Sequence, residues 1–312
     1  MLPSSVLRPF PALDVIASIG FAAHVEALHA RIDERLLAWI PAPQPDTDTV
    51  SRAMHDCALA PGKRLRPLLV FATANLFDVA RECSARAATA LEAIHVYSLI
   101  HDDLPSMDND DMRRGKPTVH KMFDEATAIL AGDCLHALAF EVLADPATHA
   151  DPFVRIELVL DLARAAGPNG MAGGQIMDIE AETTRFDLNT VTRLQQMKTG
   201  ALISASVEAG AILGRLPPEG RVGLRGYAHD LGLAFQIADD LLDAEGDEAV
   251  AGKKLRKDEV AGKETFLSLL GPERAREQAR MLVDQAIAHL HSYGKEADLL
   301  RDIARFVLER DR

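Results

Sequence analysis

Two short acidic segments contain the residues best suited to chemistry. The first, HDDLPSMDNDDMRRG at residues 101–115, follows an apolar stretch and has five aspartates within ten residues, with two arginines directly after them. Such crowding is electrostatically unfavourable unless a cation or solvent compensates the repulsion. Oxygen ligands with no cysteine nearby suit Mg²⁺ rather than zinc. A solvated acidic loop is the alternative, and the apolar stretch and the arginines on either side disfavour it.

The second acidic segment, FQIADDLLD, covers residues 235–243. Asp239 and Asp243 are four residues apart and share one face of a helix, and Gln236 lies on that face three residues before Asp239. Their neighbours are apolar, and burying unpaired carboxylates there would be costly. One such motif often arises by chance on an amphipathic helix, whereas two on apolar helices rarely do. We therefore predict that the two segments clamp Mg²⁺ between them.

Basic residues that could bind phosphates occur in other segments. Mg²⁺ held by one or two carboxylates usually completes its shell with substrate phosphates, so cations are expected as well. GKRLRP at residues 62–67 opens an apolar segment and places Lys63 and Arg66 three apart on one face, a favourable anion site at a helix start. An ordinary basic turn is the alternative for this hexapeptide. Further candidates are Arg113, Arg114, Lys198, Lys253 and Lys263.

His95 and a glycine pair are weaker signals. His95 comes seven residues before Asp102, so both project from one helix face two turns apart. A lone histidine on an apolar helix is usually a core residue, but this alignment makes His95 a candidate diphosphate contact. GGQ at residues 173–175, followed by Asp178, is a polar insertion in a helical segment. Close helix packing and a functional role explain it equally well.

Helices must position these residues, because apolar/polar alternation typical of strands is nearly absent and Ala, Leu, Glu and Arg dominate. Breakers containing proline or glycine separate the segments. The predicted helical segments are 14–40, 48–58, 65–77, 81–104, 120–143, 152–167, 169–183, 188–214, 219–244, 264–270, 272–292 and 296–310. The charged stretch 245–263 is a long loop, suited to a lid over phosphates or to a solvated charge run. The prediction is one all-α domain of long packed helices.

The composition excludes several functional classes. The 312 residues carry a formal net charge of −13, are 48% hydrophobic and have a mean hydropathy of −0.01. The acidic balance argues against a nucleic-acid partner, and no uncharged apolar run is long enough to span a membrane. The three cysteines, Cys57, Cys83 and Cys134, form no paired motif, and residues 1–20 lack the basic start and apolar stretch of a signal peptide. We therefore expect a cytoplasmic protein, with residues 1–13 poorly ordered.

Taken together, the motifs resemble the trans-prenyltransferases of the polyprenyl synthase family, and bacterial farnesyl diphosphate synthases above all. GKRLRP, IHVYSLIHDDLPSMDNDDMRRG, LAGD, GGQ..D, KTGAL and FQIADDLLD occur in the family's order, and the match covers nearly the whole chain. The resemblance implies the isoprenoid synthase fold, a single all-α domain of long, mostly antiparallel helices around a deep central cavity. It also implies a homodimer, and three Mg²⁺ ions bound together with diphosphate.

The resemblance assigns roles to matching positions of this chain. Metal ligands would be Asp102, Asp108 and Asp239, with Asp103, Asp240 and Asp243 as additional carboxylates. Residues holding isopentenyl diphosphate would be Lys63, Arg66, His95 and Arg114. Residues holding the allylic diphosphate would be Arg113, Lys198, Gln236 and Lys253, with Lys263 helping at closure. Thr199 and Gln236 would place oxygens near the developing carbocation.

The implied reaction is head-to-tail condensation of isopentenyl diphosphate with dimethylallyl or geranyl diphosphate. Metal and cations stabilise the departing diphosphate, and the isopentenyl double bond attacks the allylic carbocation. In the family, bulk at the positions of Tyr97 and Ser98 floors the tunnel for the growing chain. Tyr97 and the spacing of the first acidic segment point to farnesyl diphosphate, with fifteen carbons. One departure is GKET at residues 262–265 in place of a GKST-like stretch, which keeps the lysine but adds an acid near the diphosphate.

Other functions stay open on the sequence. A geranylgeranyl diphosphate synthase is the nearest rival. An all-α metal-dependent phosphohydrolase would take His95, His101, Asp102 and a distant aspartate as ligands, but it leaves the second acidic segment and GKRLRP unexplained. A class I terpene cyclase would need only the allylic half, and the isopentenyl-binding basic residues argue against it. A non-catalytic prenyl-binding subunit is disfavoured because both acidic segments are complete.

Overall fold

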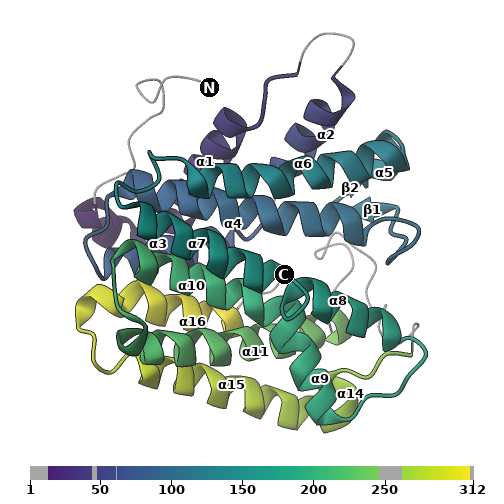
Figure 1. The fold of residues 1–312 in the computed structure, drawn as a ribbon. Coiled ribbons are helices and arrows are strands. Elements are labelled where there is room, and N and C mark those ends of the chain that lie inside the picture. Colours follow the sequence, from purple (N-terminus) through teal and green to yellow (C-terminus); the bar gives the residue numbers. More distant parts are fainter. Residues whose placement is uncertain (1–12, 44–47, 61, 246–261, 310–312) are drawn as a thin grey trace. The chain divides into compact units, whose positions relative to one another are not determined.

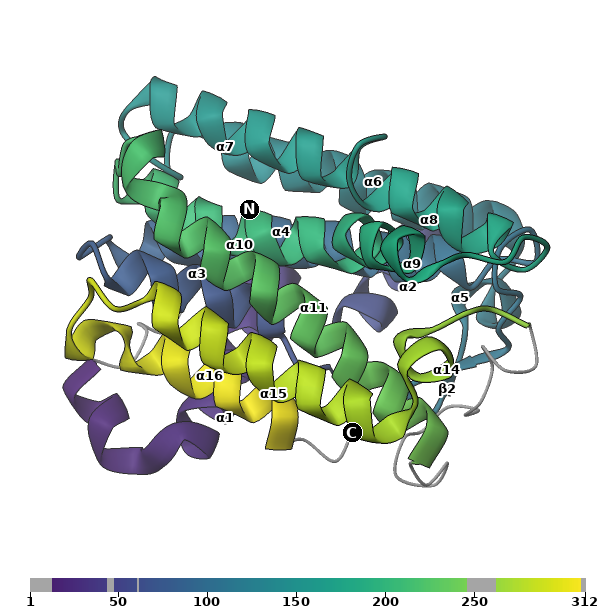
Figure 2. The same ribbon diagram turned by 90° about the horizontal axis from the view of Figure 1, so that it is seen from below.

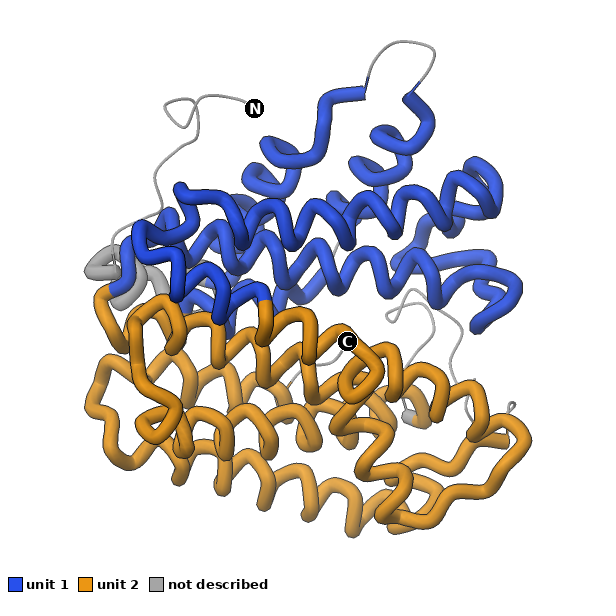
Figure 3. The backbone as a smooth tube through the Cα atoms, viewed as in Figure 1, with its two compact units in different colours: residues 1–71, 79–159 blue, residues 72–78, 160–312 orange. Residues whose placement is uncertain are grey.

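A computed structural model describes four stretches of the chain, residues 13–43, 48–60, 62–245 and 262–309 (Figure 1). The chain divides into two compact units, each described here by itself (Figure 3). Unit 1 comprises residues 1–71 and 79–159, and unit 2 comprises residues 72–78 and 160–312. Two helices, α3 (Leu65–Asn75) and α7 (Pro152–Ala166), begin in unit 1 and end in unit 2.

Unit 1 is built on two long helices, α4 (Arg81–Asp102) and α6 (Glu125–Ala144), which lie antiparallel and side by side (Figure 1). Every residue of α4 from Ser84 to Ile94 is buried, and many are alanines, whose small side chains allow close helix approach. Asp124 caps α6 by accepting a hydrogen bond from the Thr127 amide at 2.7 Å. The other elements are α1 (Leu13–Trp39), α2 (Thr49–Ala58), α5 (Val119–Met122) and the antiparallel strands β1 (Met112–Arg113) and β2 (Lys116–Pro117).

Unit 2 packs α11 (Val222–Glu245) against α10 (Ala201–Leu213), α15 (Pro272–His289) and α16 (Asp298–Glu309) (Figure 2). Tyr227 of α11 is fully buried and donates its hydroxyl hydrogen bond to the Leu300 carbonyl at 2.8 Å, which satisfies the polar end of a core aromatic residue. The other elements are α8 (Met171–Glu180), α9 (Leu188–Gln195), α14 (Phe266–Leu270), a π-helical turn (Gln196–Gly200) and short 3₁₀ turns (Pro218–Arg221 and Lys295–Ala297).

The all-α fold class is confirmed, with three local differences from the predicted segments. The segment predicted at 120–143 is two helices, because the chain breaks at Phe123 before the Asp124 cap. The segment predicted at 188–214 contains the π-helical turn. Residues 112–117 form a small hairpin that the sequence pattern does not show. The single domain stays a prediction, and residues 1–12 and 246–261 lie outside the described residues.

One described helix, α6, is long and apolar enough to cross a membrane when judged by length and composition alone. Half of its most apolar window is buried inside the protein. The core helix of a globular protein has the same properties, so this helix is weak support for a membrane span.

Candidate active site

The first acidic segment starts at the end of α4, whose last residue is Asp102. The chain then folds back on the helix end, since the Asp108 amide donates to the Asp102 carbonyl at 2.9 Å and the Asp110 amide donates to the Asp103 carbonyl at 3.2 Å. Asn109, at φ 50°, takes the left-handed conformation that short polar side chains tolerate. Asp102 is half-buried and Asp108 is exposed, so two carboxylates reach solvent at this end of α4.

Asp103 is the buried carboxylate of the segment, and Arg113 of β1 binds both of its oxygens. The shortest contact joins Arg113 Nη2 to Asp103 Oδ1 at 2.6 Å. Burial raises the pKa of Asp103, and the Arg113 guanidinium offsets only part of this effect. The resemblance implies that Arg113 holds the allylic diphosphate. In the structure Asp103 is its partner and fixes it on the hairpin.

The available donors fit Mg²⁺. Asp102 and Asp108 in unit 1, and Asp239 and Asp243 in unit 2, offer only oxygen, and all four are at least partly exposed. Within the described stretches, no three histidine, cysteine, aspartate or glutamate side chains converge as a complete protein metal site. Mg²⁺ commonly takes one or two carboxylates and fills its shell with water and substrate phosphate, so these carboxylates are compatible with this metal.

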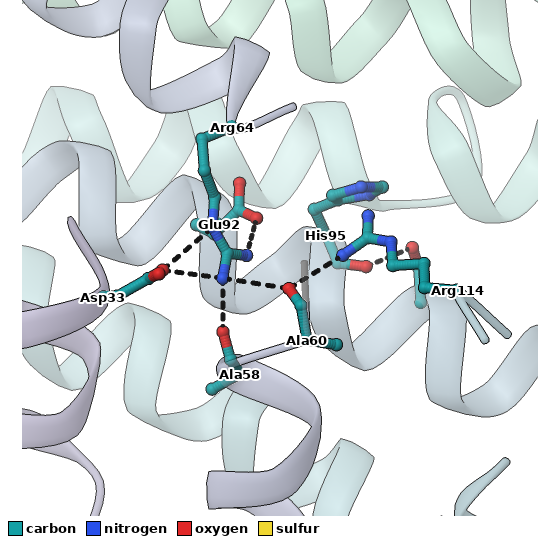
Figure 4. A network of polar contacts seen from close by, with 8 residues as sticks. Asp33, Ala58, Ala60, Arg64, Glu92, His95 and Arg114 are labelled. Carbon is teal, nitrogen blue, oxygen red and sulfur yellow. Dashed lines mark hydrogen bonds and ion pairs between the residues drawn. The ribbon is translucent and has the colours of Figure 1, made fainter. Parts of the chain in front are cut away.

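Three of the predicted isopentenyl diphosphate residues, Arg66, His95 and Arg114, form a cationic cluster in unit 1, and the fourth, Lys63, lies two residues before the start of α3. His95 and Arg114 lie beside each other (Figure 4). Burial lowers the pKa of His95 well below its usual value, and Arg66 and Arg114 lower it further. The imidazole is therefore neutral near pH 7 and can still donate one N–H to a phosphate oxygen. Gly62 leaves room for the cluster, because a Cβ there would lie 2.6 Å from Arg114 Nη1.

The start of α3 corrects one detail of the predicted cluster. The sequence pattern places Lys63 and Arg66 on one helix face, but this is wrong, because α3 begins at Leu65 and Lys63 precedes it. Arg64 between them has φ 44° and turns the chain, and its carbonyl accepts the hydrogen bond of the Leu68 amide at 3.1 Å. Lys63 therefore lies in the turn before α3 and Arg66 in the first turn of α3, rather than on one helix face.

In unit 2, Asp178 of α8 holds two predicted phosphate-binding lysines together. Lys198 Nζ lies 2.8 Å and Lys263 Nζ lies 3.0 Å from Asp178 Oδ2. Burial alone would raise the pKa of Asp178, but the two lysines outweigh it and the pKa is lowered. Asp178 therefore stays ionised and holds the two ammonium groups side by side. Lys253 lies outside the described residues.

Thr199, Gln236 and Asp240 form a chain of hydrogen bonds in unit 2. Thr199 Oγ1 donates to Gln236 Oε1, and Gln236 Nε2 donates to Asp240 Oδ1, each at 3.1 Å. Asp240 is buried, and its second oxygen accepts the Phe266 amide at 3.0 Å at the start of α14. Asp240 thus orients Gln236 and α14, while Asp239 is a partly exposed carboxylate of this segment.

The π-helical turn carries Lys198 and Thr199, and Gly174 of α8 packs directly on it. A Cβ on Gly174 would lie 2.2 Å from the Lys198 amide nitrogen and 2.6 Å from its Cα. π-turns occur frequently at functional sites. Close packing therefore explains why residue 174 is a glycine. The backbone on which it packs belongs to Lys198, a predicted site residue.

Tyr97 of α4 lies in an aromatic cluster with α6. Its ring meets the His136 ring edge-on at 5.0 Å between centroids and the His101 ring at 5.6 Å, and His136 in turn contacts Phe140 at 5.1 Å. Edge-to-face pairs at these distances are favourable. The Ser98 hydroxyl donates a hydrogen bond to the His95 carbonyl at 2.9 Å, one turn earlier on α4. Tyr97, rather than Ser98, is therefore the bulky group at the predicted chain-length position.

Glu264, the acid that GKET has in place of the serine of a GKST-like stretch, has a hydrogen-bond partner four residues along the chain. Glu264 accepts a hydrogen bond from the Ser268 hydroxyl at 2.7 Å, and Thr265 caps α14 through the Ser268 amide. Lys263 keeps its contact with Asp178. The substitution thus leaves the lysine in place.

Three residues next to the predicted site were not singled out by the sequence pattern: Arg64, Glu92 and His136. Arg64 is the second of the three basic residues of GKRLRP, and Glu92 is a lone acid in the buried stretch of α4. An acid within a run of buried alanines is a signal that would have indicated Glu92. His136 offers no such signal, because its contact with Tyr97 joins two helices.

The family follows from comparison with known proteins. The polyprenyl synthetase family model matches residues 47–303, and the chain belongs to this family. Farnesyl diphosphate synthase of Escherichia coli (strain K12) is 43% identical over 302 residues, which cover 94% of this chain and 100% of that protein. Geranylgeranyl diphosphate synthases are also among the relatives, at about 40% identity.

Solved structures agree with this assignment. An FPP/GFPP synthase from Zymomonas mobilis superposes with a TM-score of 0.86 at 54% identity, covering 93% of this chain and 99% of that one. A geranyltransferase from Helicobacter pylori, solved with magnesium and isoprenyl diphosphate, superposes with a TM-score of 0.80 at 32% identity, covering 93% and 96%. The predicted resemblance and fold class are confirmed, and the chain is a prenyltransferase.

Proposed function

We propose that this chain condenses isopentenyl diphosphate head-to-tail with dimethylallyl or geranyl diphosphate and forms farnesyl diphosphate. The observation that carries the proposal is the presence of two separate cation clusters. One surrounds His95 in unit 1, and the other is the pair Lys198 and Lys263 on Asp178 in unit 2. Two clusters suit two diphosphate substrates, whereas a phosphohydrolase or a terpene cyclase would need only one.

The residues of the two clusters have different tasks in this reaction. Lys198 and Lys263 stabilise the charge that develops on the departing allylic diphosphate as its C–O bond ionises. The cluster around His95 holds the isopentenyl diphosphate so that its double bond can attack the allylic carbocation. Thr199 and Gln236 place oxygen atoms beside the cation, and the departing diphosphate takes the proton that is released from the new chain.

Mg²⁺ is the implied cofactor, with Asp102, Asp108 and Asp239 as its proposed ligands and Asp243 in support. The family and the magnesium-containing relative support Mg²⁺ in general, and three ions are our proposal. When bound with diphosphate, Mg²⁺ neutralises the leaving group as a Lewis acid. Asp103 and Asp240 are assigned to orienting Arg113 and Gln236 because each is already bonded to that partner.

The test is an incubation of the purified protein with Mg²⁺, isopentenyl diphosphate and geranyl diphosphate. We expect farnesyl diphosphate and inorganic diphosphate in equal amounts, and no reaction when isopentenyl diphosphate is left out. Orthophosphate release, a cyclic hydrocarbon or no product at all would each contradict the proposal. A geranylgeranyl product would keep the reaction and overturn the chain length.

Product length is the finer question, because the relatives include enzymes named for longer products. The support for fifteen carbons is the ring contact of Tyr97 with His136, which joins α4 to α6 near the end of α4. The Tyr97 ring contacts His101 and His136 edge-on, so it cannot change its rotamer without losing both contacts.

The Tyr97→Ala variant is expected to make products at least one isoprene unit longer, because the ring that stops the chain is removed. His136→Ala, with Tyr97 retained, is expected to give a mixture, because the ring loses its support on one side. Chromatography of the dephosphorylated prenols measures both. Tyr293→Ala, which removes an aromatic ring packed on Phe77 in unit 2, is the matched control and should leave the profile unchanged. An unaltered profile in Tyr97→Ala would refute the assignment.

We also propose that the enzyme is a cytoplasmic homodimer and a single catalytic domain. Unit 1 exposes large apolar side chains on α6 and α7, among them Leu130 and Phe153, and Phe153 is 78% exposed. Apolar groups of this size are unfavourable in water and suit a contact with a second copy. Sedimentation of the wild type and of a Leu130→Glu/Phe153→Glu variant measures the proposed change from dimer to monomer.

A further inference from the structure

Arg64 stands between two proposed substrate-binding residues, Lys63 and Arg66, yet its side chain lies inside the protein. That side chain is only 1% exposed. Its backbone, at φ 44°, is in the left-handed region, which is unfavourable for a residue with a Cβ. Such a conformation persists where the surrounding structure enforces it. The question is what this buried, strained arginine does.

The guanidinium of Arg64 joins three parts of unit 1 (Figure 4). Nη1 binds Glu92 Oε1 of α4 at 2.6 Å, and Nη2 binds Asp33 Oδ1 of α1 at 2.7 Å. Nη2 also donates to the carbonyls of Ala58 at 2.6 Å and Ala60 at 3.3 Å, at the end of α2. Only arginine has the planar fork of donors that such a set of acceptors needs.

The same network reaches every member of the cluster around His95. Lys63 and Arg66 flank Arg64 in the chain, and Glu92 comes one helical turn before His95 on α4. The carbonyl of Ala60 accepts a second hydrogen bond, from Arg114 Nη1 at 3.4 Å. Arg64 is thus linked through backbone, helix or a shared acceptor to the three cations and the neutral His95 that would meet the diphosphate.

Electrostatic repulsion within the cluster explains why it needs the contacts of Arg64 and Glu92. Burial lowers the pKa of Arg114, and Arg64 and Arg113 lower it further, whereas Glu92 raises it. Like charges brought together before an anion arrives repel one another, most strongly where water is excluded. Glu92, itself 1% exposed, is the buried negative charge that offsets this repulsion.

We propose that Arg64 and Glu92 are a positioning pair that assembles the isopentenyl diphosphate site before the substrate binds. The proposal rests on the proposed function, because it assigns the cluster around His95 to that substrate. Neither residue touches the substrate. Arg64 sets the turn that presents Lys63 and Arg66, and Glu92 compensates the charge of the assembled cations.

A purely structural role makes a different prediction. Buried ion pairs are poor sources of stability, and replacing both partners by apolar residues of similar size is often neutral or stabilising. If the pair serves stability alone, the double variant Arg64→Met/Glu92→Met should fold and bind substrates normally. If the pair positions the site, the same variant should fold and bind isopentenyl diphosphate poorly.

The experiment compares this double variant with the wild type and with Arg86→Met/Asp145→Met. The control pair joins the buried Arg86 of α4 to the partly exposed Asp145 at the end of α6, with Arg86 Nη2 3.0 Å from Asp145 Oδ2, and neither residue belongs to the cluster. We expect the KM for isopentenyl diphosphate to rise about tenfold or more, because displaced groups no longer match the diphosphate. The KM for geranyl diphosphate and kcat should stay within about twofold. The control should leave all three constants unchanged.

A second measurement does not depend on turnover. Calorimetric titration with isopentenyl diphosphate in EDTA, without Mg²⁺, reports the cation cluster directly, and its Kd should rise by the same factor. An unchanged Kd and KM in a folded Arg64→Met/Glu92→Met protein would overturn the proposal. Equal rises in the KM of both substrates, or the same rise in the control pair, would show a structural role only and also overturn it.

A milder variant covers the case in which the double variant does not fold. Glu92→Gln keeps a hydrogen-bond acceptor for Arg64 and removes only the charge, so we expect a several-fold rise in the Kd of isopentenyl diphosphate with thermal unfolding near that of the wild type. An unaltered Kd refutes the charge-compensating role. A wild type that binds isopentenyl diphosphate but does not condense it would overturn the proposed function and leave the positioning pair standing.

Discussion

The Asp102→Asn variant is expected to lose about 10³-fold in kcat with its fold intact. Asparagine keeps the size of the side chain and one oxygen, but it removes the charge that holds Mg²⁺ against the diphosphate. Asp102 is half-buried at the end of α4, whereas Asp103 is buried and bound by Arg113. Initial rates across a Mg²⁺ titration, together with circular dichroism, measure the effect.

Asp111→Asn is the matched control for Asp102→Asn. Asp111 belongs to the same acidic segment, but its side chain is 70% exposed and pairs with Lys121 at 2.9 Å. Surface pairs of this kind contribute about 0–1 kcal/mol, so we expect rates within about twofold of the wild type. Near-normal turnover of Asp102→Asn at saturating Mg²⁺ would contradict the role of the first acidic segment in metal binding.

The Gly174→Ala variant is expected to lower kcat/KM for geranyl diphosphate by about 10²-fold, because a shift of about 1 Å in a catalytic group has an effect of that size. The added Cβ would sit 2.2 Å from the Lys198 amide nitrogen and 2.6 Å from its Cα, and these backbone atoms cannot rotate away. Lys198 must therefore move, and its contact with Asp178 at 2.8 Å moves with it. Overpacking also costs about 1–3 kcal/mol of stability, which thermal unfolding will record.

Gly200→Ala tests whether this effect is specific to Gly174. Gly200 lies at the end of the same π-helical turn, but a Cβ there meets its nearest neighbour, the Gln195 carbonyl oxygen, at an ordinary 3.5 Å. We expect its rates to stay close to those of the wild type. The KM for isopentenyl diphosphate should be unaffected in both variants, since the cluster around His95 belongs to unit 1. Equal losses in the two variants would show a general sensitivity of the turn.

The amino-acid sequence predicts the elements of this protein well, because its signals are local. Helical periodicity and proline or glycine breakers indicate α4 and α11 within a few residues of their observed ends. Asp102 and Asp239 stand out for the same reason, since closely spaced acids in apolar helices are unusual without a cation. The family resemblance then adds roles to residues that spacing alone could not assign, such as Lys198 and Thr199.

Local signals fail where a residue's role depends on a distant partner. Lys63 and Arg66 look like neighbours on a helix face, but the positive φ of Arg64 moves the helix start between them. Gln236 is spaced to meet Asp239, but it bonds to Asp240, which is tied to Phe266 in another helix. At Arg64 the left-handed backbone changes where the helix begins, and at Gln236 the helical repeat allows either aspartate, while the tertiary contact with Phe266 holds Asp240 in place.

The sequence by itself determined the fold class, the acidic segments and the reaction type, because periodicity, charge spacing and motif order are properties of neighbouring residues. Only the tertiary structure decided which acids are buried: Asp103 and Asp240 are buried and bound by Arg113 and the Phe266 amide, while Asp102 and Asp239 are partly exposed. It also decided that Arg64 faces inward to Glu92, 28 residues away along the chain. Such pairings depend on which helices pack together, and the periodicity of one helix does not specify its partner.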